Sequence, residues 1–482
     1  MDMINSSAVS SSIALVFIAA VITKVAWGRI TADPASRNTP PHPPAVSGSS
    51  IIPLLHTLVT KGFRTMLQEQ YTKFGSVFTI SFLGMKTTFL VGPEVSAHFY
   101  QGPESEISQG SFLEFTVPMF GKDVGYGVDI ATRTEQNRFY LDVLKPAKLR
   151  CHVAPMLQEV EPGPGLGSPN PSPGCTDLAS HRPTCFLPFI WIAIGAEKNL
   201  RKMTEGGNGR EILCEMGTAR ASARLSSIFA EIVRSRKSSN RVEEDVLQNL
   251  MGSKYKDGRP TTEAEVTGLI MAILFAGQHT STATSTWTGA RLLSHTECLE
   301  AALEEQQQIV KKHGDNIDYD TLLEMSFLHC CIKEALRMHP PGPIFLSKVH
   351  KNFTVRTREG YEYEIPKGHT IASPLVINHN IPYIYKDLDV YDPHRFGPGR
   401  EEDRLGGKFT YNTFSGGRHA CPGEAYAYMQ VKVIWSHLLR NFELKLVSPF
   451  PETDWLKVTP ELRGKVEVSY KRRMLPRSML EN

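Results

Sequence analysis

The chain of 482 residues lacks the features that define several large classes of protein. Its eight cysteines have no regular spacing, which argues against a disulfide framework or a zinc site and fits a reducing compartment. No Gly-x-Gly-x-x-Gly run occurs, so the chain has no nicotinamide-binding site of the usual kind. A net charge of only +3 does not indicate nucleic-acid binding. No internal repeat is visible and the composition is ordinary, so we expect one large, helix-rich domain.

An apolar run near the start predicts a membrane anchor. Residues Ile13 to Ile22 are almost purely apolar. From Ala8 to Trp27 the chain offers about twenty residues, the length that spans a bilayer. A cleaved signal peptide is the alternative, but Asp2 stands where its basic region is expected. We therefore expect an uncleaved anchor at residues 1–27.

A proline-rich segment follows the apolar run. The sequence Pro-Pro-His-Pro-Pro at residues 40–44 is stiff and extended. We expect residues 28–50 to be a linker that holds a catalytic domain, residues 51–482, away from the membrane. Arg29 and Arg37 follow the anchor, and the positive-inside rule then places that domain in the cytosol.

The most informative segment is Phe414 to Gly423, with the sequence Phe-Ser-Gly-Gly-Arg-His-Ala-Cys-Pro-Gly. A helix-like run, Glu424 to Arg440, follows it, so Cys421 is expected near a helix N-terminus, where the dipole favours a thiolate. A thiolate can be the axial ligand of a haem iron, and glycines let backbone N–H groups approach the sulfur. A buried, inert cysteine beside an ordinary turn is the alternative.

A second segment, Glu263 to Leu293, is apolar nearly all round, which predicts a buried helix. Its middle, Ala276 to Thr282, is polar, and polar groups in a core are costly unless they have partners. The Thr280 hydroxyl can donate to the carbonyl of Ala276 and bend the helix. We expect a local opening beside Gly277 that leaves room for dioxygen and water. An ordinary kinked structural helix is the alternative.

A third segment, Lys333 to Pro341, has the sequence Lys-Glu-Ala-Leu-Arg-Met-His-Pro-Pro. Glu334 and Arg337 are three residues apart and share a helix face, so they can pair. The prolines then end the helix. Alone, such a pair is usually a solvated bridge that contributes little stability.

Together, the three segments resemble the cytochrome P-450 family of haem-thiolate monooxygenases. The cysteine segment resembles that family's haem-binding loop, and the polar turn resembles its oxygen-activation segment. The Glu-x-x-Arg pair, with the later Asp392 to Phe396, resembles its buried Glu-Arg-Arg triad. His279 before Thr280 is similar to the sterol 14α-demethylase branch, and Glu263 to Trp455 is similar to the plant members. The resemblance implies a mainly α fold with small β-sheets.

The resemblance also implies roles for individual residues. Cys421 would bind the iron of haem b, and Thr280, assisted by His279, would steer protons. Cofactor contacts are expected from Phe414, Gly417, His419, Gly423 and Arg150. The family's substrate-contact loop is similar to Phe115 to Gly121, and its C helix to Glu135 to Phe139. Candidate substrate walls are Phe115, Phe120, Tyr126, Ala276 and Leu346. The structural triad would be Glu334, Arg337 and Arg395.

The implied reaction removes the C14 methyl group of a sterol in three oxidations, each using dioxygen and two electrons. The last step releases formic acid and leaves a ring double bond. Electrons would come from NADPH through a separate flavoprotein reductase at the endoplasmic reticulum membrane. Oxidation of another position of a plant triterpene is one alternative, and a haem-binding but inactive relative is another.

The chain departs from the family pattern at several places. Leu113 replaces a tyrosine, Gly127 an acidic residue and Ser347 an arginine, all on the substrate side. The segment 161–215, where the family has helices that roof the substrate entrance, is too rich in proline and glycine for a continuous helix. We expect an altered roof there or a decayed gene. An open roof would let water reach the iron and reduced oxygen leave as peroxide.

Overall fold

The computed structural model describes residues 40–109, 113–160, 174–177, 219–239, 242–243, 245–455 and 461–473. The described residues form two compact units. Unit 1 combines those up to Gln109 with Ile344–Asn378, and unit 2 contains the others. The expected anchor, residues 1–27, lies outside the described residues. Among the residues that are described, no helix combines the length and apolar character that crossing a membrane requires.

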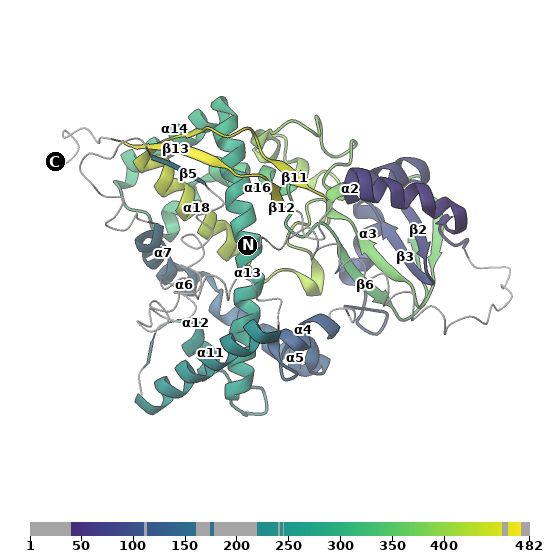
Figure 1. The fold of residues 1–482 in the computed structure, drawn as a ribbon, viewed down its shortest axis with the longest axis horizontal. Helices are drawn as coiled ribbons and strands as arrows, with labels where there is room; N and C mark the ends of the chain where they lie inside the picture. Colours follow the sequence, from purple (N-terminus) through teal and green to yellow (C-terminus); the bar gives the residue numbers. More distant parts are fainter. Residues whose placement is uncertain are drawn as a thin grey trace, which may run out of the picture. The chain divides into compact units, whose positions relative to one another are not determined.

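Unit 1 is built on a six-stranded sheet (Figure 1). The strand order is β1 (Ala45–Val46), β2 (Val77–Phe82), β3 (Met85–Leu90), β9 (Thr370–Ser373), β6 (Phe345–Val349) and β4 (Ile107–Ser108). Strands β2 and β3 form an antiparallel hairpin, and the rings of Phe78 and Phe89 stack across it at 5.0 Å. The other elements are η1 (Gly48–Ser50), α2 (Ile51–Phe74), α3 (Pro93–Gln101), β7 (Phe353–Arg356), β8 (Glu362–Ile365) and α17 (Leu375–Asn378).

The described part of the expected linker is docked on unit 1. Strand β1 pairs in parallel with β2, and the backbone N–H of Thr79 donates to the carbonyl of Pro44 at 2.9 Å. The N–H of Glu364 donates to the carbonyl of Pro41 at 3.1 Å. Proline has no N–H but keeps its carbonyl, so a proline run can border a sheet as an acceptor. Residues 41–46 are therefore part of the folded unit and do not act as a free spacer.

Unit 2 is mainly helical, with two small sheets, β10-β13-β5 and β11-β12. This confirms the expected fold class. Its helices up to the long central one are α4 (Leu113–Phe120), η3 (Gly125–Gly127), α5 (Ile130–Val143), α6 (Pro146–Leu149), η4 (Arg150–His152), α7 (Val153–Val160), α11 (Ala219–Ser239), α12 (Val246–Gly252) and α13 (Glu263–Ser294). The later helices are α14 (Thr296–His313), α15 (Tyr319–Glu324), α16 (Ser326–Met338), η5 (Pro393–Phe396), η6 (Glu402–Arg404), η7 (Gly417–His419) and α18 (Glu424–Asn441). The strands are β5 (Gly174–Asp177), β10 (Phe442–Leu446), β11 (Glu452–Asp454), β12 (Glu461–Arg463) and β13 (Glu467–Arg472).

Helix α13, the long teal helix in Figure 1, packs directly against α18. The indole N–H of Trp435 on α18 donates to the carbonyl of Ser285 at 3.0 Å. A Cβ atom on Gly289 would lie 1.9 Å from the Trp435 ring, so only glycine permits this approach. A capping box starts α13, in which Thr262 and Glu265 each accept the other's backbone N–H. The prediction of a long, largely buried helix over this segment is confirmed.

The unusual segment 161–215 lies outside the described residues, except for β5. This short strand pairs antiparallel with β13, with Thr176 opposite Val468. The sequence predicts no regular element there, because a four-residue strand between proline- and glycine-rich stretches has too few residues to show a pattern.

Candidate functional site

The cysteine loop leads directly into α18. The backbone N–H of Cys421 donates to the carbonyl of Phe414 at 2.8 Å and closes the loop. Ser415 and Gly417 have φ values of 62° and 61°, in the left-handed region that glycine adopts freely. The N–H of Gly423 donates to the Cys421 sulfur. The glycine-rich sequence therefore brings a backbone donor to the sulfur, as expected of a loop that holds a thiolate.

The pKa of the Cys421 thiol is raised above its ordinary value, chiefly by burial. The hydrogen bond from Gly423 lowers it in part, and the Glu424 carboxyl raises it further. The side chain is accessible, yet it lies in a recess where protein displaces much of the water. The helix N-terminus alone therefore does not keep this sulfur ionised, contrary to the simplest dipole argument. A bound metal cation would deprotonate it.

A cavity of about 830 Å³ borders Cys421 within unit 2. Its walls include apolar side chains of α15 and α18, such as Leu322 and Met429, and the cationic Lys333 and Lys432. None of its described lining residues belongs to α13, so this cavity does not connect Cys421 with the exposed turn at Ala276 and Thr280. Burial lowers the pKa of Lys432 to about 8, and its ammonium donates to the carbonyl of Leu322 at 2.8 Å.

The middle turn of α13 has exposed side chains, although the parts of the helix on either side of it are buried. Leu274 and Thr284 are buried, whereas Ala276 and Thr280 between them are exposed and His279 is half-buried. The Thr280 hydroxyl donates to the carbonyl of Ala276 at 2.8 Å, the bond that the spacing predicts. The helix nevertheless runs unbroken, without the expected opening beside Gly277. A carbonyl has two lone pairs, so this extra bond leaves the helical ladder intact.

These residues fit a haem. An accessible sulfur with a backbone donor is the correct ligand type for a haem iron. An exposed turn in an otherwise buried helix, here at Ala276 and Thr280, is expected where the helix borders a cofactor or a substrate. The residues that would hold the cofactor are Cys421 and its loop, including Phe414, whose ring lies 5.3 Å from that of Tyr428, and His419 on η7.

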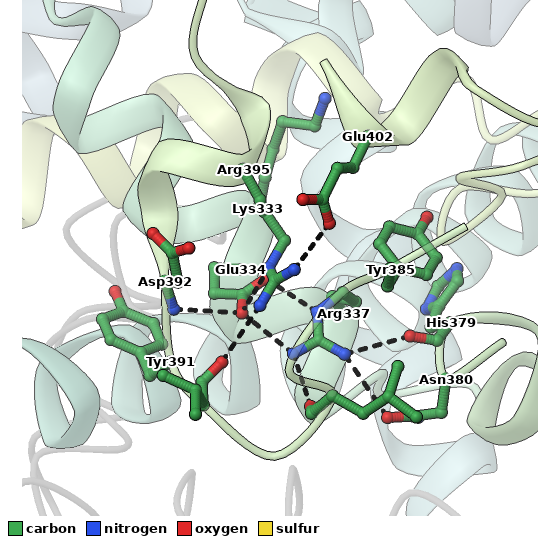
Figure 2. Close-up of polar contacts among 12 residues, drawn as sticks. Lys333, Glu334, Arg337, His379, Asn380, Tyr385, Tyr391, Asp392, Arg395 and Glu402 are labelled. Carbon is green, nitrogen blue, oxygen red and sulfur yellow. Dashed lines mark hydrogen bonds and ion pairs between the residues drawn. The ribbon is translucent and has the colours of Figure 1, made fainter. Parts of the chain in front are cut away.

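The structure brings Glu334, Arg337 and Arg395 together, each 0% exposed (Figure 2). Arg337 binds both carboxylate oxygens of Glu334, at 2.7 and 2.9 Å, and Arg395 donates to the same carboxylate at 3.0 Å. A second carboxylate, Glu402, accepts from Arg395 at 2.6 Å, so two cations face two anions. This is a buried network and not the weak solvated bridge that the spacing alone would suggest.

The remaining donors of the network reach backbone carbonyls. Arg337 donates to the carbonyls of His379 and Leu388, at 3.0 and 2.8 Å, and Arg395 donates to that of Lys386 at 2.8 Å. These bonds tie α16 to the long stretch between residues 379 and 404, which leads towards the cysteine loop (Figure 2). The network satisfies its buried charges almost completely.

Arg150 forms an exposed ion pair beside Tyr319, which lines the cavity that borders Cys421. Its guanidinium on η4 binds both oxygens of Asp320 on α15, at 2.5 and 2.7 Å, and covers the ring of Tyr319. The pair is solvent-exposed. Because both terminal nitrogens are committed to Asp320, the structure gives no support to the expected cofactor contact of Arg150, and we do not retain it.

The candidate substrate walls are divided between the two units. In unit 2, the Phe120 ring packs edge-on against Phe275 of α13 at 5.6 Å, next to the exposed Ala276. Tyr126 lies on η3 beneath the guanidinium of Arg133, at 4.8 Å. Leu346 is half-buried on β6 of unit 1, and Phe115 is on α4, with its side chain outside the described residues. Sequence analysis did not identify Phe275, whose only signal is its place beside Ala276.

Comparison with known proteins shows the family. The cytochrome P450 family model matches residues 214–468. The chain is 46% identical over 451 residues to the obtusifoliol 14-alpha demethylase of Sorghum bicolor, covering 90% of this chain and 91% of that protein. It is 45% identical to the sterol 14-demethylase of Arabidopsis thaliana (94% and 96%) and 30% identical to the lanosterol 14-alpha demethylase of Bos taurus (84% and 83%).

A solved structure, the retinoic acid bound cyanobacterial CYP120A1, has the same fold, with a TM-score of 0.74. It is 20% identical and covers 90% of this chain and 100% of its own. Membership of this family implies a haem iron and electrons from a redox partner. The expected family is therefore confirmed. The chain belongs to the cytochrome P450 family of haem-thiolate monooxygenases, in which it is similar to the sterol 14-demethylases.

Proposed function

We propose that this monooxygenase removes the 14α-methyl group of a plant sterol of the obtusifoliol type, with electrons from NADPH delivered by a separate flavoprotein reductase. Identities of 44–46% to three plant demethylases, over at least 90% of the chain, support this substrate class. The observation that carries the proposal is the accessible Cys421 in the same unit as the bare turn of α13 at Ala276 and Thr280. The bound haem supplies the oxidising chemistry, and the chain must orient the sterol and supply protons.

Thr280 is the candidate proton-handling residue. Its hydroxyl donates to the carbonyl of Ala276, which orients the lone pairs of Oγ1 to accept a hydrogen bond from a proton donor in the site. Three more threonines of α13, including Thr286, make the same bond to the carbonyl four residues earlier, but those are buried. Thr280 is therefore distinguished by its exposure and not by its hydrogen bond.

The anchor and location are part of the same proposal. Residues 1–27 would anchor the protein in the endoplasmic reticulum membrane, with both units in the cytosol. Because Pro41 is docked on unit 1, only residues 28–40 would connect the two, a tether of at most about 45 Å. Unit 1 would therefore stay close to the bilayer, where an apolar sterol dissolves.

Product analysis tests the function. The full chain is co-expressed with a plant reductase and supplied with obtusifoliol, lanosterol and a panel of cyclic triterpenes. We expect a thiolate-type carbon monoxide difference band, a 14-demethylated product and one formate per sterol. Oxidation of a triterpene at another carbon would replace the proposed substrate. A normal band without any turnover would identify a haem-binding but inactive relative.

Replacing Thr280 by alanine is expected to lower the product formed per NADPH consumed by roughly fivefold or more, the value of one lost hydrogen bond of about 1 kcal/mol. The unused electrons should appear as peroxide. Thr286→Ala is the matched control, since it removes a hydroxyl with the same local bond, to Thr282, but at a buried position. Equal coupling in the wild type and Thr280→Ala would exclude a proton-handling role.

A further inference from the structure

The segment Gly121–Asp129, between α4 and α5, is fixed at both ends. At its start, the N–H of Gly121 donates to the carbonyl of Val117 at 3.0 Å. At its end, the carboxylate of Asp129 caps α5 by accepting the backbone N–H groups of Ala131 and Thr132, at 2.9 and 3.0 Å. Tyr126, a candidate substrate wall, lies within this segment, so its position depends on what holds the middle.

The start of the segment packs closely on α13. A Cβ atom on Gly268 would lie 2.4 Å from the carbonyl oxygen of Phe120 and 2.8 Å from the Val124 side chain, so only glycine permits the contact. Val124 is 2% exposed. Farther along, a Cβ atom on Gly127 would lie 2.4 Å from the carbonyl oxygen of Lys122. Gly127, which stands where the family has an acidic residue, therefore lets the main chain at Gly127 approach the carbonyl of Lys122 closely.

The middle of the segment is held by one buried amide. Gln136 on α5 is 1% exposed, and its Oε1 accepts the backbone N–H of Gly125 at 2.9 Å. Its Nε2 donates to the carbonyl of Asp123 at 2.9 Å and to the hydroxyl of Tyr255 at 3.1 Å. A single side chain thus binds the main chain on both sides of Val124.

The orientation of this amide is set from α13. The Tyr255 hydroxyl donates to Oε1 of Glu265 at 2.8 Å, so its oxygen remains free to accept from Gln136. Burial alone would raise the pKa of Glu265, but bonds from Arg259, Thr262 and Tyr255 outweigh it and lower the pKa. The carboxylate is therefore ionised at neutral pH and accepts the end of a donor chain that runs from the Gln136 amide through the Tyr255 hydroxyl.

The position of the Tyr126 ring also depends on α5, the helix that carries Gln136. Arg133, which covers its ring at 4.8 Å, stands on α5 three residues before Gln136 and shares a face with it. If the amide were lost, the main chain at Asp123 and Gly125, on either side of Val124 and next to Tyr126, would lose its buried hydrogen-bond partner.

We propose that Gln136 is a positioning residue for substrate selection, which fixes the Tyr126 segment to α13 through Tyr255 and Glu265. The proposal rests on the proposed function, because the segment selects among substrates only if Tyr126 lines the sterol site. It assigns selectivity to a buried amide that need not touch the sterol.

The test compares Gln136→Met with Gln306→Met in the haem-loaded full chain. Gln306 is a matched control, because it is 2% exposed and hydrogen-bonded to Arg440 on another face of unit 2. Three quantities are measured: amide hydrogen exchange in residues 121–129, the Kd values of obtusifoliol and lanosterol by spectral titration, and the thermal midpoint. For Gln136→Met we expect faster exchange in the segment and a change of at least about fivefold in the ratio of the two Kd values.

Gln306→Met should lower the thermal midpoint while leaving segment exchange and the Kd ratio unchanged. Unchanged exchange in Gln136→Met, or equal changes in both variants, would overturn the proposal. If Gln136→Met does not retain haem, Tyr255→Phe removes the hydroxyl that links Gln136 to Glu265 but keeps the two main-chain bonds of Gln136, and it must then shift the Kd ratio. A wild type that responds to no sterol would refute the proposed function, whereas the exchange measurement would still decide whether Gln136 holds the segment.

Discussion

Replacing Cys421 by alanine is expected to abolish both the thiolate-type carbon monoxide band and all turnover. The iron would lose its only sulfur ligand, and the oxidising power of a haem-thiolate centre depends on that ligand. Without a metal, burial chiefly raises the pKa of this thiol and so favours its protonated form. The measurement is the reduced carbon monoxide difference spectrum, followed by product analysis with obtusifoliol.

Cys151→Ala is the matched control, since Cys151 is another exposed cysteine, outside the loop, whose thiol donates to the carbonyl of Lys148. Its spectrum and turnover should match those of the wild type. A Cys421→Ala protein that kept the thiolate band would show that another cysteine binds the iron. The whole assignment of the site would then be wrong.

The parts of the site that could be predicted are those whose chemistry is local in sequence. The bond from Thr280 to Ala276 follows from a spacing of four within one helix, and the loop around Cys421 lies within ten residues. The mainly helical fold follows from helical periodicity and from the family motifs. Each of these predictions needs only residues that are close together in the sequence.

The parts that could not be predicted depend on partners far away in the chain. Arg150 pairs with Asp320, 170 residues later, and no local pattern shows that its charge is already committed. In the sequence, Gln136 resembles any other polar residue of a helix. Only the structure shows that its amide donates to the carbonyl of Asp123 and to the hydroxyl of Tyr255. The docking of the proline run is likewise visible only in the structure, through the N–H groups of β2 and β8 that donate to its carbonyls.

The direction in which the pKa of Cys421 is shifted also differs from the expectation based on the sequence. The helix N-terminus at α18 does favour an anion, by up to about 2 kcal/mol in a partly buried geometry. Burial and the neighbouring Glu424 act in the opposite direction. The effect of the helix dipole can be predicted from the sequence, because it depends only on where a helix begins. Burial cannot, because it depends on how the chain packs.

Replacing Glu334 by glutamine is expected to prevent stable folding of unit 2. The substitution keeps the shape but removes the anion that faces Arg337 and Arg395, and all three side chains are 0% exposed. Breaking a buried ion pair by removing one partner typically costs about 3–5 kcal/mol. Whole domains have only about 5–15 kcal/mol of stability, so the loss would take a large share of it. The measurements are the thermal midpoint and the yield of haem-loaded protein.

The matched control is Glu401→Gln, which removes the same charge from the exposed pair with Arg404, 2.7 Å apart. Solvent screens that pair, so the thermal midpoint should hardly change. The contrast separates burial from charge, because both variants replace a carboxylate that binds an arginine. If Glu334→Gln were as stable as Glu401→Gln, Glu402 and the backbone carbonyls would have to balance both buried cations alone. The Glu334 carboxylate would then be dispensable for the fold, and its place between the two arginines would need another explanation.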